Sequence, residues 1–362
     1  MMKKNKRKLI RKKIRKKNNK KEKKNFLKKK LNKYKIIILV LFSIFLFIPI
    51  SHISINKLPI SPININNLSN NFTNIEYDIK VCVCTLGKQE NRYIREFVSH
   101  YEKYGIDKIY LYDNNDINGE RFEEVINDYI SKGFVEILNW RGRLYQISNI
   151  MVDCYTRNKK NYDWLIFYEL DEFIHLSNYT NVKPFLKQPK FEKCQLIYLN
   201  SICHTDNNKL YYENKSLSER FPERAPMTKH GGKYLVIKSI VRGNITNIGF
   251  NNVHLFNSKL INCNGYGNRD KFDKSVSYLS TEPDYTTYYV DHYYSKSTEE
   301  FINKLNRGDA FSTSTEYYLH RVEKYFNQSE MTKEKIDMIE KGTGLNLSKF
   351  RQQLLDKNRN SL

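Results

Sequence analysis

The 362-residue sequence predicts an α/β fold, a mostly parallel sheet with helices on both faces, preceded by a single transmembrane helix. Two observations lead to this prediction. Between residues 79 and 168, β-branched and aromatic runs alternate with segments whose apolar residues recur at helical spacing. Before them, an apolar stretch follows a strongly basic N-terminus. Alternating strands and helices with short links form mostly parallel sheets, and such sheets bind ligands at the carboxyl ends of their strands.

Basic residues are concentrated at the N-terminus. The chain holds 62 Lys and Arg against 39 Asp and Glu, a net charge of +23. Residues 1–35 carry 20 of the basic residues and one Glu, so the remainder, with 42 basic and 38 acidic residues, has a net charge of only +4. We therefore expect a solvated cytosolic tail that sets membrane topology, with anionic lipid contact as a second role, and no nucleic-acid partner. The 40% hydrophobic composition excludes a wholly disordered chain.

Residues 36–55 are predicted to be a transmembrane signal anchor. No charge occurs between Lys35 and Lys57, and a helix needs roughly 20 apolar residues to cross a bilayer. The positive-inside rule then gives a single-pass type II protein whose catalytic part is lumenal, in the Golgi or endoplasmic reticulum. A cleaved signal peptide is the alternative, although the basic region is much longer than a usual n-region. Residues 56–77, rich in Asn, Ser and Pro, are predicted to be a stalk.

The expected elements follow in order along the chain. Strands are predicted at residues 79–85, 108–112, 134–138 and 164–168, and helices at residues 92–104, 120–131 and 145–157. A capping-box pattern from Ser297 to Glu300 predicts the start of a later helix. The main domain is placed at residues 78–308. Residues 309–362 form a C-terminal extension with helical periodicity at 333–341 and 347–355, whose role stays open.

Six cysteines follow the predicted anchor, with neither a CxxC pair nor zinc-type spacing. They are Cys82, Cys84, Cys154, Cys194, Cys203 and Cys263. An oxidising lumen would permit disulfides, but Cys82 and Cys84 share one face of a predicted strand, and we expect both to be small buried hydrophobic residues. Glycosylation sequons at Asn67, Asn71, Asn178, Asn214, Asn244, Asn327 and Asn346 are compatible with a lumenal domain.

Polar and acidic residues stand directly after three of the predicted strands. Lys88 to Glu90 follows the first, Asp113 ends the second, and Glu169-Leu170-Asp171-Glu172 follows the fourth. Two carboxylates separated by one residue lie on the same side of an extended segment. Such a pair suits Mg²⁺ or Mn²⁺ bridging a diphosphate. The alternative is a solvated acidic turn.

The ordered set of motifs resembles the family 92 glycosyltransferases and their family 2 relatives. It consists of VCVCTLGKQENRYIREFVSHYEKYGIDKIYLYDNND, NYDWLIFYELDEFIHL, KSIV at 238–241 and DHYYSKSTEEFINKLNRG at 291–308, and covers residues 79–308. The resemblance implies a GT-A fold and transfer of a sugar from a nucleotide-sugar donor to a glycan or glycoconjugate acceptor. A divalent cation, Mn²⁺ or Mg²⁺, would serve as cofactor, and a type II anchor is common in the family.

The resemblance also implies roles for individual residues. Asp171 is the expected metal ligand, with His292 or His254 as the third ligand and His292 favoured because Lys296 is nearby. Glu169 stands in place of the usual Asp, while Asp116 and Asn118 depart from the family pattern. The expected donor-binding residues are Lys88, Glu90, Asp113, Glu169, Lys238 and Lys296.

If the reaction inverts the anomeric centre, a carboxylate must deprotonate the acceptor hydroxyl. Glu219 is the favoured catalytic base because it precedes an Arg-Phe pair of the family motif, at Arg220-Phe221. Glu223, Asp206 and Asp270 are the alternative bases. A surface ion pair would explain Glu219 without any catalytic role. As an alternative function, a catalytically weak, membrane-tethered carbohydrate-binding protein on the same fold is favoured by Glu169 at the first acidic position.

Overall fold

The computed structural model describes residues 78–143, 147–225, 236–246, 248, 260–269, 284–308 and 314–359. The predicted tail, anchor and stalk lie outside the described residues, as do His254 and Asp270. Within the described ranges, no helix is long and apolar enough to cross a membrane. Ile75–Leu362 forms one compact unit, and the fold below is that of this unit.

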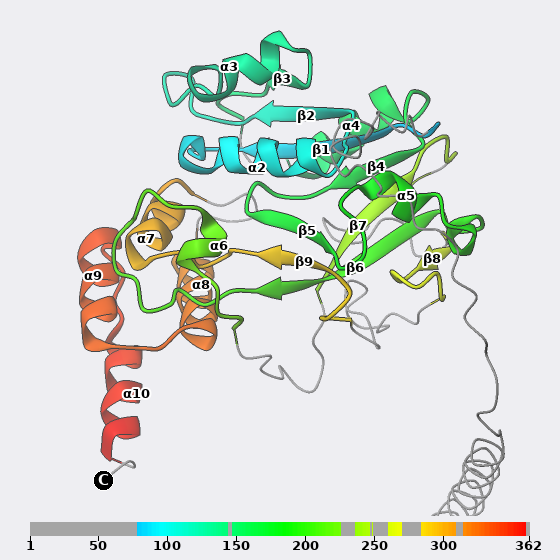
Figure 1. Ribbon diagram of the computed structural model, residues 1–362. Helices are drawn as coiled ribbons and strands as arrows, with labels where there is room; N and C mark the ends of the chain where they lie inside the picture. The colour runs from blue at the N-terminus through cyan, green and yellow to red at the C-terminus, as the bar shows by residue number, and fades with distance from the viewer. Residues whose placement is uncertain are drawn as a thin grey trace, which may run out of the picture. The chain divides into compact units, whose positions relative to one another are not determined.

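In the part of the unit that the structure describes, the centre is one mixed sheet of nine strands (Figure 1). Its order is β3-β2-β1-β4-β7-β6-β9-β5, with β8 beside β6. The strands are β1 Val81–Gly87, β2 Lys108–Asp113, β3 Val135–Asn139, β4 Trp164–Phe167, β5 Glu172–Leu176, β6 Leu196–Cys203, β7 Ile237–Arg242, β8 Asn262–Cys263 and β9 Tyr288–His292. The first four strands in the chain are those that the sequence predicts.

The prediction of a mostly parallel sheet is confirmed throughout one half, whereas the other half combines antiparallel pairs with the parallel pairs β6–β8 and β6–β9. β3, β2, β1 and β4 are parallel, as alternation with helices requires. β4 then pairs antiparallel with β7, β7 with β6, and β9 with β5. This half is mixed because its strands follow one another without the regular intervening helices that force parallel pairing. The fold is therefore α/β with a mixed sheet.

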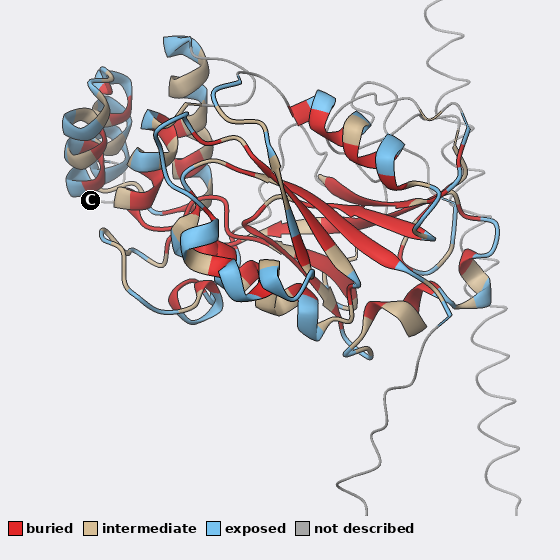
Figure 2. Cartoon of the chain, turned by 90° about the horizontal axis from the view of Figure 1, so that it is seen from above, coloured by how far each residue is buried: buried red, intermediate tan, exposed pale blue. Residues whose placement is uncertain are grey.

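Helices cover both faces of the parallel half (Figure 2). Val81 and Val83 of β1 share a core with α2, Asn91–Lys103, and α3, Glu123–Ser131. Cys82 and Cys84 point to the other face, where they pack with α4, Ile147–Asn158. Alternation along a strand thus assigns each helix to its face. Shorter helices are α5 Val182–Leu186, the 3₁₀ turn Pro189–Phe191 and α6 Leu217–Arg220.

Four helices after β9 form a second core beside one end of the sheet (Figure 1). They are α7 Thr298–Asn306, α8 Thr315–Gln328, α9 Lys333–Thr343 and α10 Ser348–Arg359. The capping box at Ser297 and Glu300 is confirmed, as are the helices expected near 333–341 and 347–355. α8 was not predicted. The core joins α7, from the predicted main domain, to the helices of the predicted extension.

The cysteine prediction is wrong for Cys84. Cys84 forms a disulfide with Cys154, and Cys194 forms one with Cys263. The reason lies in the packing: Cys84 faces α4, where Cys154 lies on the inner side, 6.2 Å away between Cα atoms. Cys82 is a buried free thiol, as expected.

Candidate active site

A tight acidic turn joins β4 to β5. The Glu172 amide donates to the Glu169 carbonyl at 3.0 Å, and the Glu169 amide donates to the Glu172 carboxylate at 3.1 Å. Leu170 anchors the turn in the core. It packs so closely on Gly87 at the end of β1 that an added Cβ there would lie 2.6 Å from its side chain. The ends of β1 and β4 therefore fix the turn between them.

Carboxylates of this turn meet His292 at the end of β9. Ligand atoms of Glu169, Asp171, Glu172 and His292 all lie within 4.8 Å of one another. His292 Nε2 is 3.4 Å from Asp171 Oδ1 and 3.7 Å from Glu172 Oε1. Hard carboxylate oxygens with one imidazole suit Mn²⁺ or Mg²⁺. The donor set therefore fits the divalent cation that the acidic motif implies, and it includes Glu172, which the sequence did not single out as a ligand.

Burial and charge shift the pKa values of these groups strongly. Burial raises the pKa of Glu172 to about 8. Burial would also raise the pKa of Asp171, but Lys304, Lys296 and His292 together hold it well below its usual range. For His292, burial is outweighed by Asp171 and Glu172, which raise its pKa to about 9. Such opposed shifts within one cluster are typical of functional sites.

Among the residues with described positions, three lysines contact the acidic turn. Lys304 of α7 donates to Asp171 Oδ2 at 2.8 Å, and Lys296 Nζ lies 3.6 Å from the same oxygen. Lys238 of β7 lies 3.1 Å from Glu169 and also pairs with Glu172. The predicted donor-binding residues Lys238 and Lys296 are thus beside the predicted metal ligand. Lys304 was missed, although it lies in the motif DHYYSKSTEEFINKLNRG eight residues after Lys296.

Glu90 joins the same cluster, whereas the side chain of Lys88 points elsewhere. The buried Glu90 carboxylate pairs with Arg307 and lies 3.8 Å from Lys296 Nζ. Arg307 also donates to the Lys88 carbonyl at 2.7 Å. The Lys88 ammonium instead pairs with the exposed Asp116 at 2.9 Å. The loop after β1 is therefore connected to α7 through Arg307, a further residue that the sequence did not single out.

Asp113 is buried, and its carboxylate is held by Asn115 and Arg141 from the loops after β2 and β3. Its Oδ1 accepts from the Asn115 amide and side chain at 2.9 and 2.8 Å, and its Oδ2 pairs with Arg141. Arg141 also donates to the carbonyls of Gly119 and Glu120. The carboxylate that was expected to bind donor thus has protein partners on both oxygens.

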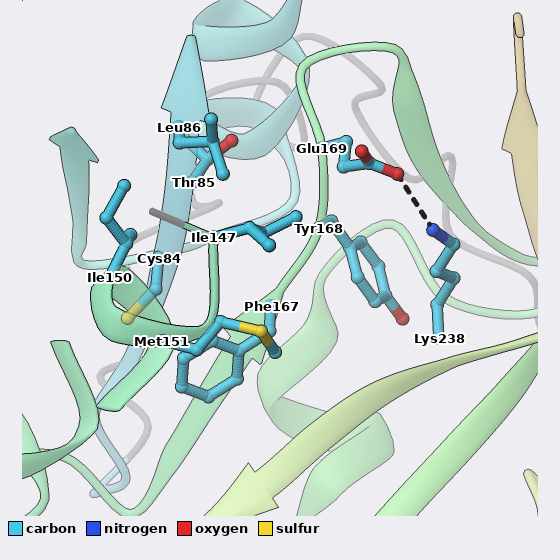
Figure 3. A pocket seen from close by; sticks show the side chains of 10 residues that line it. All are labelled: Cys84, Thr85, Leu86, Ile147, Ile150, Met151, Phe167, Tyr168, Glu169 and Lys238. Carbon is cyan, nitrogen blue, oxygen red and sulfur yellow. Dashed lines mark hydrogen bonds and ion pairs between the residues drawn. The ribbon is translucent and has the colours of Figure 1, made fainter. Parts of the chain in front are cut away.

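A pocket opens beside the acidic turn (Figure 3). Its walls come from β1, β4 and α4, and the ion pair of Glu169 and Lys238 stands at one side. Thr85 and Tyr168 are among its lining residues, and their hydroxyl oxygens are buried without a hydrogen-bond partner among the described residues. The other lining residues are Cys84, Leu86, Ile147, Ile150, Met151 and Phe167. An apolar pocket with a few polar groups at strand ends is typical of a ligand site.

Two cations of α8, Arg321 and Lys324, lie against the ring of Tyr294, two residues after His292. Lys324 Nζ is 3.8 Å from the centre of the Tyr294 ring, and the Arg321 guanidinium is 4.9 Å from it. Burial, together with Arg321 and Lys238, lowers the pKa of Lys324. These residues were missed because no sequence pattern predicted that α8 would pack beside the strand ends.

The carboxylates considered as catalytic base lie in different surroundings. Glu219 is exposed on α6, where its carboxylate closes a capping box with Ser216. Asp206 is buried, 2.6 Å from Lys335 and hydrogen-bonded to Tyr325. Glu223 is exposed. The catalytic role of Glu219 stays a prediction, and the contacts found for it are those of a helix cap.

The fold and site together define an α/β protein with an acidic, lysine-lined site at the carboxyl ends of its strands. A family model described as Glycosyltransferase family 92 matches residues 77–341. The chain belongs to this family, which confirms the resemblance seen in the sequence.

Curated relatives share part of the chain. Glycosyltransferase family 92 protein Os08g0121900 of Oryza sativa subsp. japonica is 27% identical over 126 residues, which is 34% of this chain and 21% of that protein. Glycosyltransferase family 92 protein RCOM_0530710 of Ricinus communis is 24% identical over 127 residues, covering 35% and 22%. The chain thus matches only about a fifth of the length of these relatives.

Among solved structures, the chain is similar to Staphylococcus aureus TarS residues 1–349 in complex with UDP. The identity is 13%, the match covers 45% of this chain and 47% of that one, and the TM-score is 0.30. A likeness at this TM-score supports no conclusion about this chain.

Proposed function

We propose that the protein is a glycosyltransferase on a GT-A fold that transfers a sugar from a nucleotide-diphosphate donor to a hydroxyl of a glycan or glycoconjugate. The proposal rests on one observation. At the strand ends, Asp171 and His292 lie beside three lysines, Lys238, Lys296 and Lys304. Carboxylates and imidazole suit a divalent cation, and lysines suit a diphosphate. Family membership supports the same reaction class.

A divalent cation would be held by Asp171 and His292, with Glu169 and Glu172 completing the donor set. When bound, it would neutralise negative charge that develops on the leaving diphosphate. Lys304 and Lys296, both in contact with Asp171, would bind the diphosphate oxygens directly. The pocket beside the acidic turn, lined by side chains of β1, β4 and α4, would take the rest of the donor.

In the transfer itself, the bond from the anomeric carbon to the diphosphate oxygen breaks, and its electron pair stays on that oxygen. The acceptor oxygen forms the new bond to the anomeric carbon and loses its proton to a base. We retain Glu219 as the base that the sequence proposes. We also propose that residues 36–55 anchor the enzyme as a type II membrane protein with its site in the lumen of the Golgi or endoplasmic reticulum.

The test is donor binding and transfer by the full chain in detergent. We expect one nucleotide sugar to raise the unfolding temperature in the presence of Mn²⁺ and to be turned over. Asp171→Asn should lower kcat by at least about 100-fold, because it removes a carboxylate that would hold the divalent cation. Asp128→Asn is the matched control, because Asp128 is half exposed and pairs with Arg95 on the surface.

Two results would count against the proposal. Full activity and metal affinity in Asp171→Asn would show that the acidic turn is not the site. Binding of glycans without binding of any nucleotide sugar would instead select the carbohydrate-binding alternative.

A further inference from the structure

Both oxygens of the Asp171 carboxylate have partners within the protein. Oδ1 lies 3.4 Å from His292 Nε2. Oδ2 accepts a hydrogen bond from Lys304 Nζ at 2.8 Å, and Lys296 Nζ lies 3.6 Å from it. Asp171 is only 4% exposed, so its charge is stabilised by these partners more than by water. The two lysines therefore hold the oxygen that does not face His292.

The acidic turn is close to electrically balanced by side chains of the chain itself. Among the residues that the structure describes, the carboxylates of Glu169, Asp171 and Glu172 are paired with Lys238, Lys296 and Lys304. Lys324 adds a weaker attraction to Glu169. A divalent cation on these carboxylates would thus enter a site whose negative charge is already offset. Because like charges repel strongly in a buried site, each lysine that stays nearby weakens the binding of a metal ion.

Lys304 competes most directly, since its hydrogen bond uses an oxygen that a metal ion on Asp171 would also need. Its backbone belongs to α7, whose start is fixed by the capping box of Ser297 and Glu300. Its ammonium has other partners as well, the Tyr294 carbonyl at 3.2 Å and the centre of the Tyr294 ring at 4.5 Å. A carbonyl and a ring face both accept a cation, so Lys304 keeps partners when Asp171 is released.

We propose that Lys304 is an internal counter-ion that competes with the divalent cation for Asp171 and so keeps the affinity for metal alone low. The inference rests on the proposed function and deepens it, because it assigns regulation of metal binding to a residue of α7. A metal ion that arrives together with an anion brings less net positive charge and meets less repulsion from the lysines. The site therefore discriminates against metal ions that bind alone.

The test is calorimetric titration of the full chain in detergent with Mn²⁺ alone, at fixed pH and ionic strength. We expect Lys304→Met to bind Mn²⁺ on the order of tenfold more tightly than the unaltered chain, because a positive charge beside the metal is removed. Lys304→Arg keeps the charge and should keep the weak affinity. Lys132→Met is the matched control, since Lys132 is exposed and lies over the ring of Tyr129, 5.3 Å from its centre.

The expected direction separates competition from structural damage. A variant whose site is distorted would bind the metal more weakly, so a gain in affinity cannot come from a loss of structure. Lys304→Gln supplies a second neutral side chain, and its affinity should rise as well. If Lys304→Met unfolds at a lower temperature than the unaltered chain, the affinity of Lys304→Gln decides. Equal or lower affinity in both neutral variants, or no Mn²⁺ binding by either, overturns the inference.

Failure of the proposed function would be seen separately. A gain in Mn²⁺ affinity in Lys304→Met, in a chain that binds no nucleotide sugar, supports the competition and counts against the glycosyltransferase. Normal sugar transfer by the unaltered chain, with the same Mn²⁺ affinity in both neutral variants, overturns the competition and leaves the proposed function standing.

Discussion

His292 acquires its chemistry from its position in the sheet. At the end of β9 it lies opposite Glu172 in the antiparallel ladder and opposite Cys203 in the parallel one. This register points the imidazole at Asp171 and Glu172, which keep it protonated at neutral pH. His292 can therefore exist in two protonation states. The imidazolium pairs with the carboxylates, and the neutral ring can bind a metal.

The affinity for Mn²⁺ is expected to rise between pH 6 and pH 9. Because the pKa of His292 is raised to about 9, a proton must leave before the ring can bind a metal, and that proton is harder to remove at low pH. Calorimetry in buffers with different ionisation enthalpies would measure both the affinity and the proton released. A pH-independent affinity without proton release would show that His292 does not bind the metal.

At the scale of the structural elements, the end of β1 packs closely on the turn that follows β4. Gly87 ends β1, and the side chains of Phe122 and Leu170 fill the space where a Cβ would stand. Leu170 belongs to the acidic turn, so the close contact transmits the position of β1 to Asp171. The absence of a side chain at residue 87 is thus a condition for the geometry of the site.

Gly87→Ala should lower the free energy of unfolding by about 1–3 kcal/mol, because the added methyl group would lie 2.5 Å from Phe122 and 2.6 Å from Leu170. Mn²⁺ affinity should fall as well, since the turn must shift. Urea unfolding and metal titration measure the two effects. Gly119→Ala is the control, because its nearest neighbour would be 3.3 Å away. Equal stability and equal metal affinity in both variants would contradict this explanation.

On the scale of the whole unit, a buried ion pair connects the C-terminal helices to the sheet. Lys335 of α9 lies 2.6 Å from Asp206, just after β6, and both side chains are 1% exposed. Lys335 also donates to Asn208 and to the Glu330 carbonyl, at 2.8 and 2.9 Å. This connection helps to keep α7 and α8 against the strand ends, where Lys304 and Lys324 lie.

Lys335→Met is expected to cost about 3–5 kcal/mol of unfolding free energy, because it leaves the Asp206 carboxylate buried without its cation. Urea unfolding would measure the loss. Lys333→Met, an exposed change at the start of the same helix, should have almost no effect. The double variant Asp206→Asn, Lys335→Met should be more stable than Lys335→Met alone. If the two have the same free energy of unfolding, the unpaired charge of Asp206 is not the cause of the loss.

The parallel half of the fold and the acidic turn could be predicted because their signals are local. Each strand is a short apolar run, and Glu169, Asp171 and Glu172 follow one of them directly. The mixed half could not be predicted, since β5 pairs with β9 across more than 100 residues and no local pattern specifies that register. For the same reason Lys304, Arg321 and Lys324 were missed: their nearness to Asp171 and Tyr294 depends on how helices pack.

The two disulfides have a practical consequence for anyone preparing this protein. Cys84–Cys154 ties the wall of the pocket to α4, and Cys194–Cys263 ties the segment just before β6 to β8. A reducing bacterial cytoplasm would leave both pairs as thiols. Recombinant material should therefore come from secretory expression in eukaryotic cells, and assays should omit dithiothreitol, because reduction would remove the disulfide that joins the pocket wall to α4.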